Sequence, residues 1–127
     1  MMDAVSDNRS PLELLASCVE RMQAGKWRFV QLRDVTFSRD SINGDDIDLL
    51  GDAESVRLLI SAAFAWVRDG ICHIRVVRNS PFKTALTLFS VDGVHRVDFD
   101  LWTEVFQFGN KGVSLTYDGC SSAIVRE

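Results

Sequence analysis

Two pairs of aspartates are the residues of this sequence whose type and spacing could do chemistry together. Asp46 and Asp48 stand in "GDDIDLL", and Asp98 and Asp100 stand in "RVDFDLW". Alternate residues of a β-strand point to the same face, so each pair would project from one face of its strand. If the two strands are neighbours, three or four carboxylates share a small area of sheet, and their like charges require compensation.

A hard divalent cation would compensate such a group. Mg²⁺ prefers oxygen ligands and is commonly held by one or two carboxylates together with substrate phosphates. Two such ions, Mg²⁺ or Mn²⁺, support in-line phosphoryl or nucleotidyl transfer. Paired aspartates on a solvated strand face that bind nothing are the alternative, because short motifs often occur without a ligand. Asp is depleted in strands, which favours a functional reason for two alternating pairs.

Two further aspartates near the first pair have simpler expected roles. Asp45 follows the Asn43-Gly44 dipeptide, which is a strong turn signal, and we expect it to serve that turn. Asp52 precedes an apolar pattern of helical period, and we expect it to cap that helix.

The elements that position the aspartates follow from apolar periodicity and turn signals. Ser10 and Pro11 predict the start of a first helix, which Gly25 ends. A β-prone run follows in "KWRFVQLRD", and "DIDLL" is a second short strand. A second helix begins after Asp52 and ends at Gly70. Its expected buried face consists of Val56, Leu59, Ile60, Ala63, Phe64 and Val67.

Three strands are expected after the second helix, in "ICHIRVVR", "KTALTLFSV" and "VHRVDFDLW". The last two are predicted to join through a two-residue hairpin at Asp92-Gly93. Trp27, Trp66 and Trp102 are expected to pack in the core. The element order predicts an α/β (α+β) domain, with helices packed on a central mixed sheet.

The composition narrows the class of protein. A chain of 127 residues is about the size of one domain, and we expect one domain over 1–127 with residues 1–9 disordered. The net charge of -4 gives no general reason to bind nucleic acid. Cys18, Cys72 and Cys120 suggest neither a disulfide framework nor a zinc site. The chain shows no signal peptide and no run that could span a membrane, so a cytoplasmic location without a membrane partner is expected.

The end of the sequence leaves two points open. Apolar alternation continues to the C-terminus without a closing signal, so the chain could be the N-terminal part of a longer protein. An unfinished strand of this kind could also pair with the sheet edge of a second copy and form a homo-oligomer.

The segment "GDDIDLL" resembles the G-S-D-I-D-L-L segment of the nucleotidyltransferase (DNA polymerase beta-like) superfamily. From about Trp27 to Glu104, the order "FVQLRD…GDDIDLLGD…TLFSVDGVHRVDFDLWTE" is particularly similar to nucleotidyltransferase-like proteins found among bacterial surface-polysaccharide genes. The resemblance implies a nucleotidyltransferase-like fold and a cytoplasmic transferase of bacterial polysaccharide biosynthesis. Such a protein would transfer a nucleotidyl group from a nucleoside triphosphate to a hydroxyl acceptor that the sequence does not identify.

The resemblance also implies roles for individual residues. Asp46 and Asp48 match the two metal-binding aspartates, and Asp100 matches the third carboxylate, which is both a metal ligand and the base for the acceptor hydroxyl. Asp98 is the alternative for that third position. Arg33, as a possible phosphate clamp, and Gly44 are the candidate nucleotide-binding residues. An arginine at the end of a strand can equally be solvated or paired with a neighbouring carboxylate.

The sequence departs from the superfamily at one point. The glycine-serine pair that follows the first strand and helps to hold the phosphates is absent, and Leu32–Asp34 stands in its place. This departure favours the alternative function, a catalytically degenerate module that keeps the nucleotidyltransferase fold for binding or regulation.

Overall fold

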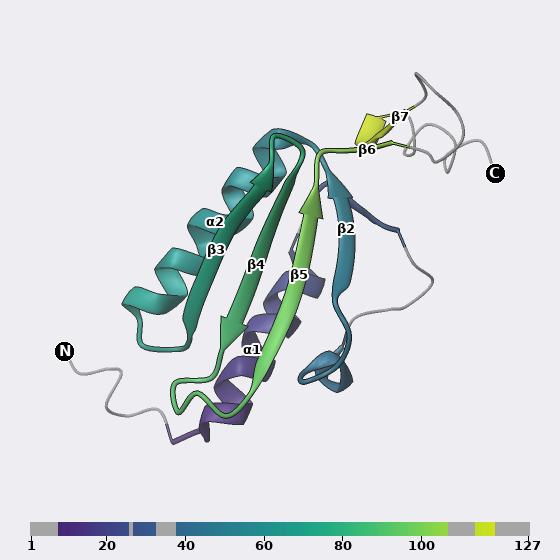
Figure 1. Ribbon diagram of the computed structural model, residues 1–127. Coiled ribbons are helices and arrows are strands. Elements are labelled where there is room, and N and C mark those ends of the chain that lie inside the picture. Colours follow the sequence, from purple (N-terminus) through teal and green to yellow (C-terminus); the bar gives the residue numbers. More distant parts are fainter. Residues whose placement is uncertain (1–7, 26, 33–37, 107–113, 119–127) are drawn as a thin grey trace.

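The computed structural model describes residues 8–25, 27–32, 38–106 and 114–118. It has the expected α+β architecture, in which two α-helices lie on one face of a five-stranded mixed sheet (Figure 1). The helices are α1 (Pro11–Ala24) and α2 (Ala53–Arg68), and a short 3-10 helix, η2, spans Arg39–Ser41. The sheet strands are β1 (Phe29–Gln31), β2 (Ile47–Gly51), β3 (His73–Ser80), β4 (Lys83–Phe89) and β5 (Arg96–Trp102).

The strand order in the sheet is β1-β2-β5-β4-β3. β2 and β5 run parallel, whereas the other neighbouring pairs are antiparallel. The two expected aspartate strands are therefore neighbours, as the site prediction required. Two further short strands, β6 (Glu104–Phe106) and β7 (Ser114–Thr116), form a separate antiparallel pair.

The core lies between the helices and the face of the sheet that they cover. Ile47 and Leu49 of β2 and Phe99 and Leu101 of β5 are buried there, as their alternation predicted. Side chains of both helices complete the same cluster, chiefly Leu15, Val19, Met22, Val56, Leu59, Ala63 and Trp66. The opposite face of the sheet, which we call the open face, has no helix of the described residues over it (Figure 1).

The predicted starts of both helices are confirmed by their capping hydrogen bonds, whereas α2 ends at Arg68, two residues before the predicted Gly70. The Ser10 hydroxyl accepts a hydrogen bond from the Glu13 amide at 3.2 Å, and the Asp52 carboxylate accepts one from the Ser55 amide at 2.8 Å. These bonds satisfy amide groups that a helix N-terminus leaves without intrahelical partners. The bonds to the Ser55 amide and hydroxyl lower the pKa of Asp52, although its burial opposes the shift.

Three sequence expectations were wrong, two about which side chains are buried and one about the length of a connection. Phe64 is 50% exposed, because the buried face of α2 is rotated toward Trp66. Trp102 lies on the open face rather than in the core, since it alternates with the buried Leu101. The connection between β4 and β5 takes residues 90–95 instead of two. In that connection the Asp92 carboxylate accepts hydrogen bonds from Ser90 Oγ at 2.6 Å and from the Val94 amide at 3.1 Å, which stabilise a wider turn.

Cys18 of α1 and Cys72, just before β3, are buried free thiols. The two thiols form a hydrogen bond with each other. This bond, together with burial, raises the pKa of Cys72. Their separation in the sequence gave no sign of this proximity. In the part of the chain that the structure describes, no helix is both long and apolar enough to cross a membrane.

Candidate functional site

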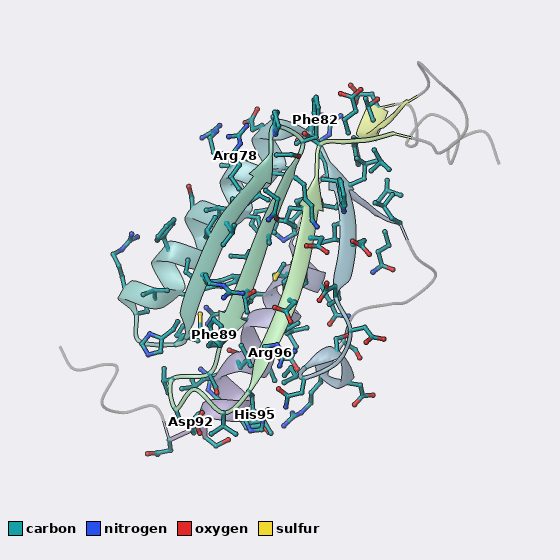
Figure 2. The ribbon with its side chains drawn as sticks, viewed as in Figure 1. Arg78, Phe82, Phe89, Asp92, His95 and Arg96 are labelled. Atoms are coloured by element: carbon teal, nitrogen blue, oxygen red, sulfur yellow. The ribbon has the colours of Figure 1, made fainter. Side chains whose placement is uncertain are left out.

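The parallel pairing of β2 and β5 brings the two aspartate strands together on the open face. Asp48 lies directly opposite Asp100 in this pairing. Asp46 is exposed immediately before β2. Figure 2 shows side-chain oxygens gathered over β2 and β5, on the face opposite the helices.

Asn43 fixes the loop that leads into β2. Its backbone has a positive φ of 65°, and its amide donates a hydrogen bond to the Arg96 carbonyl at 2.7 Å. Its side-chain oxygen accepts from the Arg96 amide at 3.0 Å, and its side-chain nitrogen lies 2.8 Å from His95 Nδ1. These bonds extend the contact between the loop and β5, so they hold the chain that carries Asp46 next to the Asp98–Asp100 strand.

The surroundings of Asp100 oppose its ionisation. Partial burial raises the pKa of Asp100, and the negative charges of Asp46 and Asp48 raise it further, whereas Lys83 lowers it. The Lys83 ammonium lies 3.5 Å from an Asp100 oxygen. Asp46, Asp48 and Asp100 are therefore close enough to repel one another, and Lys83 offsets part of that repulsion.

Lys83 and Trp102 connect three strands through these carboxylates. The Lys83 nitrogen lies 5.0 Å from the centroid of the Trp102 ring, within the range of a cation–π contact. The indole N–H of Trp102 donates a hydrogen bond to Asp48 at 3.2 Å. Sequence reasoning missed both residues, although alternation along β4 would place Lys83 on the open face. The pairing of β4 with β5 sets Lys83 opposite Trp102. The hairpin predicted at Asp92-Gly93 implies this register, so it is the signal that could have identified Lys83.

Asp98 has different partners from Asp100. One of its oxygens accepts a hydrogen bond from the Thr87 hydroxyl at 2.7 Å. The other lies 2.9 Å from Arg96 Nε. Because each oxygen of Asp98 has a partner, Asp100 is the carboxylate of β5 that is better placed to join Asp46 and Asp48.

The other candidate residues contribute less to this site. Arg33 lies outside the described residues. The Gly44 amide donates to the Ser41 carbonyl at 3.0 Å, so it closes the turn after η2. Asp45 is exposed next to that turn.

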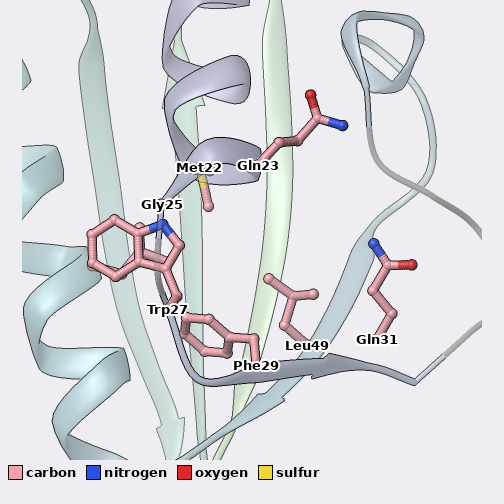
Figure 3. Close-up of a pocket in the computed structure, with 8 residues that line it drawn as sticks. Met22, Gln23, Gly25, Trp27, Phe29, Gln31 and Leu49 are labelled. Carbon is pink, nitrogen blue, oxygen red and sulfur yellow. The ribbon is translucent and has the colours of Figure 1, made fainter.

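The carboxylates of the open face do not form a ready cage for a metal. Across the described ranges, no group of three or more His, Cys, Asp or Glu side chains is arranged to hold a metal ion. A cavity of about 280 Å³ lies elsewhere, between the end of α1 and β1, and is lined by Met22, Trp27, Phe29 and Leu49 among others (Figure 3). No aspartate among the described residues lines it, and neither Asp46, Asp48 nor Asp100 contributes to it.

The chain was also compared with known proteins. No model of a known protein family, no curated protein and no solved structure matches it.

Proposed function

We propose that this chain is a nucleotidyltransferase-like protein that uses Mg²⁺ or Mn²⁺ to transfer a nucleotidyl group from a nucleoside triphosphate to a hydroxyl acceptor. The observation that supports this proposal best is the parallel pairing that sets Asp48 opposite Asp100. The effect of Asp46 and Asp48 on the pKa of Asp100 also supports it, since it indicates that the three carboxylates act on one another. A role in bacterial polysaccharide biosynthesis, in the cytoplasm, is the context that the sequence resemblance suggests.

The donor set fits Mg²⁺ in its chemistry. Asp46 and Asp48 offer carboxylate oxygens from alternate positions, and Mg²⁺ usually needs only one or two carboxylates because water and phosphate oxygens complete its shell. A cage of three protein ligands is therefore not required. When bound, the ion would neutralise phosphate charge and align the triphosphate for in-line attack.

The remaining residues of the site would orient groups and hold a proton. Asp100 would accept the proton of the acceptor hydroxyl, and the burial that raises its pKa also increases its affinity for that proton. Lys83 would keep the Asp100 side chain in place through their ion pair. Trp102 would hold the orientation of Asp48 through its indole hydrogen bond.

Thermal unfolding in the presence of Mg²⁺ or Mn²⁺, with and without each nucleoside triphosphate, tests the proposal. We expect the metal to raise the melting temperature and one nucleotide to raise it further, because a ligand at 100 times its Kd stabilises the folded state by about 2.7 kcal/mol. Asp48→Asn should abolish the shift. Asp98→Asn is the matched control, since it removes the same charge from the same face but from a carboxylate that Thr87 and Arg96 already engage.

Two results would count against the proposal. The first is that neither metal shifts the melting temperature of the wild type. The second is that the melting temperature of the Asp48→Asn variant rises with metal as much as that of the wild type. If the metal and one nucleotide do raise the melting temperature, transfer itself is measured next. The donor is that triphosphate labelled at its α-phosphate, and simple sugars and sugar phosphates are offered as acceptors.

A catalytically degenerate binding or regulatory module is the second candidate function. It is favoured by the ion pair between Lys83 and Asp100, because the ammonium already supplies positive charge where a metal would be needed. On this view the wild type would show no metal response, and Lys83→Met would lower its melting temperature by leaving Asp100 without its counter-ion. A metal response that grows in Lys83→Met would instead show that the ammonium competes with the ion.

A further inference from the structure

β3 is an edge strand of the sheet. It pairs with β4 on one side, and no described strand pairs with its other side (Figure 1). Val76 and Val77, in its centre, are 37% and 41% exposed and point to opposite faces. The backbone groups along such an edge can pair with another extended chain.

The charge of β3 differs in sign from that of the whole protein. The strand carries His73, Arg75 and Arg78, all exposed, and no acidic residue, whereas the chain has a net charge of -4. A basic edge on an acidic protein attracts an acidic partner and repels a basic one.

A groove adjoins one end of this edge on the helix side. It has a volume of about 430 Å³ and lies between α2 and the turn from β3 to β4, with Ile60, Phe64, Arg78 and Phe82 in its lining. Figure 2 shows Arg78 and Phe82 at that end of the sheet. Phe64 of α2 is 50% exposed and lines this groove together with Arg78 of β3. An apolar side chain of an added strand that lies beside Arg78 would therefore find apolar contacts in the groove.

A second copy of this chain is a poor partner for β3. In an antiparallel pairing that keeps both helix layers on one side, opposite residues must belong to the same face. If Val76 of one copy lies opposite Val76 of the other, the two Arg75 side chains are diagonal neighbours across the new strand pair. If the two Val77 residues lie opposite each other instead, the two Arg78 side chains are diagonal neighbours. Diagonal neighbours lie about 7–8 Å apart, so like charges meet in both arrangements.

We propose that β3 is a docking edge for an extended acidic segment of another protein, which adds to the sheet as a further strand. Acidic side chains of that segment would lie on the open face beside His73 and Arg75. Apolar side chains, alternating with them, would lie on the helix side beside Ile74 and Val76. The main-chain hydrogen bonds would supply affinity, and the alternation of charge and apolar surface would supply specificity.

A fluorescently labelled eight-residue peptide of alternating Glu and Val, followed by anisotropy, is the probe for this site. A peptide of alternating Lys and Val is its charge-reversed partner. A third peptide keeps the Glu-Val sequence but has N-methyl groups on alternate backbone nitrogens, so that it retains its charge and loses the hydrogen bonds of a strand. Arg75→Glu is tested against Arg21→Glu, an exposed position on α1 with the same change in net charge.

The proposal predicts that the Glu-Val peptide binds the wild type and the Arg21→Glu variant equally, and Arg75→Glu at least tenfold more weakly. The Lys-Val peptide should bind better to Arg75→Glu than to the wild type, and the N-methylated peptide should bind to neither. Three results would overturn the proposal. The N-methylated peptide would bind the wild type as tightly as the Glu-Val peptide does, Arg21→Glu would weaken Glu-Val binding as much as Arg75→Glu does, or the Glu-Val peptide would not bind at all. A wild-type dimer in sedimentation that Arg75→Glu strengthens would also overturn it, because the edge would then belong to a second copy.

Discussion

The two faces of the central sheet are built from the same strands, but one face buries apolar side chains and the other gathers carboxylates. On the helix side of β5, Phe99 is 1% exposed and packs in the core. On the open face of the same strand, partial burial and then the negative charges of Asp46 and Asp48 raise the pKa of Asp100. Because successive residues of a strand alternate between faces, one strand stabilises the fold at odd positions and carries a costly charge cluster at even ones. Substitutions on the two faces should therefore change stability in opposite directions.

The largest expected effect comes from the helix side. Phe99→Ala should lower the free energy of unfolding by about 3–5 kcal/mol, because it removes a buried aromatic ring and leaves a cavity between the sheet and the helices. Urea denaturation measures this loss. Val94→Ala, at a position that is 67% exposed, is the control and should change the unfolding free energy little. A similar loss in both variants would mean that the helix-covered face is not the main source of stability.

An intermediate effect is expected where a carboxylate supports the helix layer. Asp52→Ala should cost about 1 kcal/mol of stability, because it removes the cap of α2. The folded-state pKa of Asp52 is lowered, so its contribution is present above the unfolded-state pKa and is lost as the pH falls through the folded-state pKa. Melting temperatures measured across the acid range should thus converge for the wild type and the variant. A gap that persists in acid would show that the cap does not depend on the charge.

The smallest expected effect comes from the open face and has the opposite sign. The folded-state pKa of Asp100 is raised, so ionised Asp100 weakens the fold at any pH above that value and has no such effect below the unfolded-state pKa. Asp100→Asn should be slightly more stable than the wild type at neutral pH, and the difference should disappear as the pH falls. A less stable variant at neutral pH would mean that the ion pair with Lys83 outweighs the burial and repulsion.

The sequence contained the local part of this comparison. Alternation in "GDDIDLL" and "RVDFDLW" predicted which side chains turn inward and which aspartates share a face, and the caps at Ser10 and Asp52 followed from residue type alone. Each of these features is decided within a few residues of chain, where periodicity and hydrogen-bonding preferences dominate.

The features that the sequence did not predict depend on contacts between distant segments. Trp102 of β5 reaches Asp48 only because β2 and β5, which are far apart in the sequence, pair in parallel. Phe64 matched the apolar pattern of α2, yet the packing of the helix on the sheet turned Trp66 inward instead. Periodicity gives a broad apolar stripe, and the packing partner selects which side of that stripe is buried.

The parallel contact between β2 and β5 also has a consequence for the order of folding. β3, β4 and β5 are consecutive and antiparallel, so they can pair through short loops. Asp48 and Asp100, by contrast, meet only after the whole intervening chain is in place, and such distant contacts form at a high entropic cost. We expect hydrogen exchange during refolding to protect β4 before β2. The carboxylates would then come together only in the last step of folding. Their repulsion would therefore lower the stability of the completed sheet without slowing the earlier pairing of β3, β4 and β5.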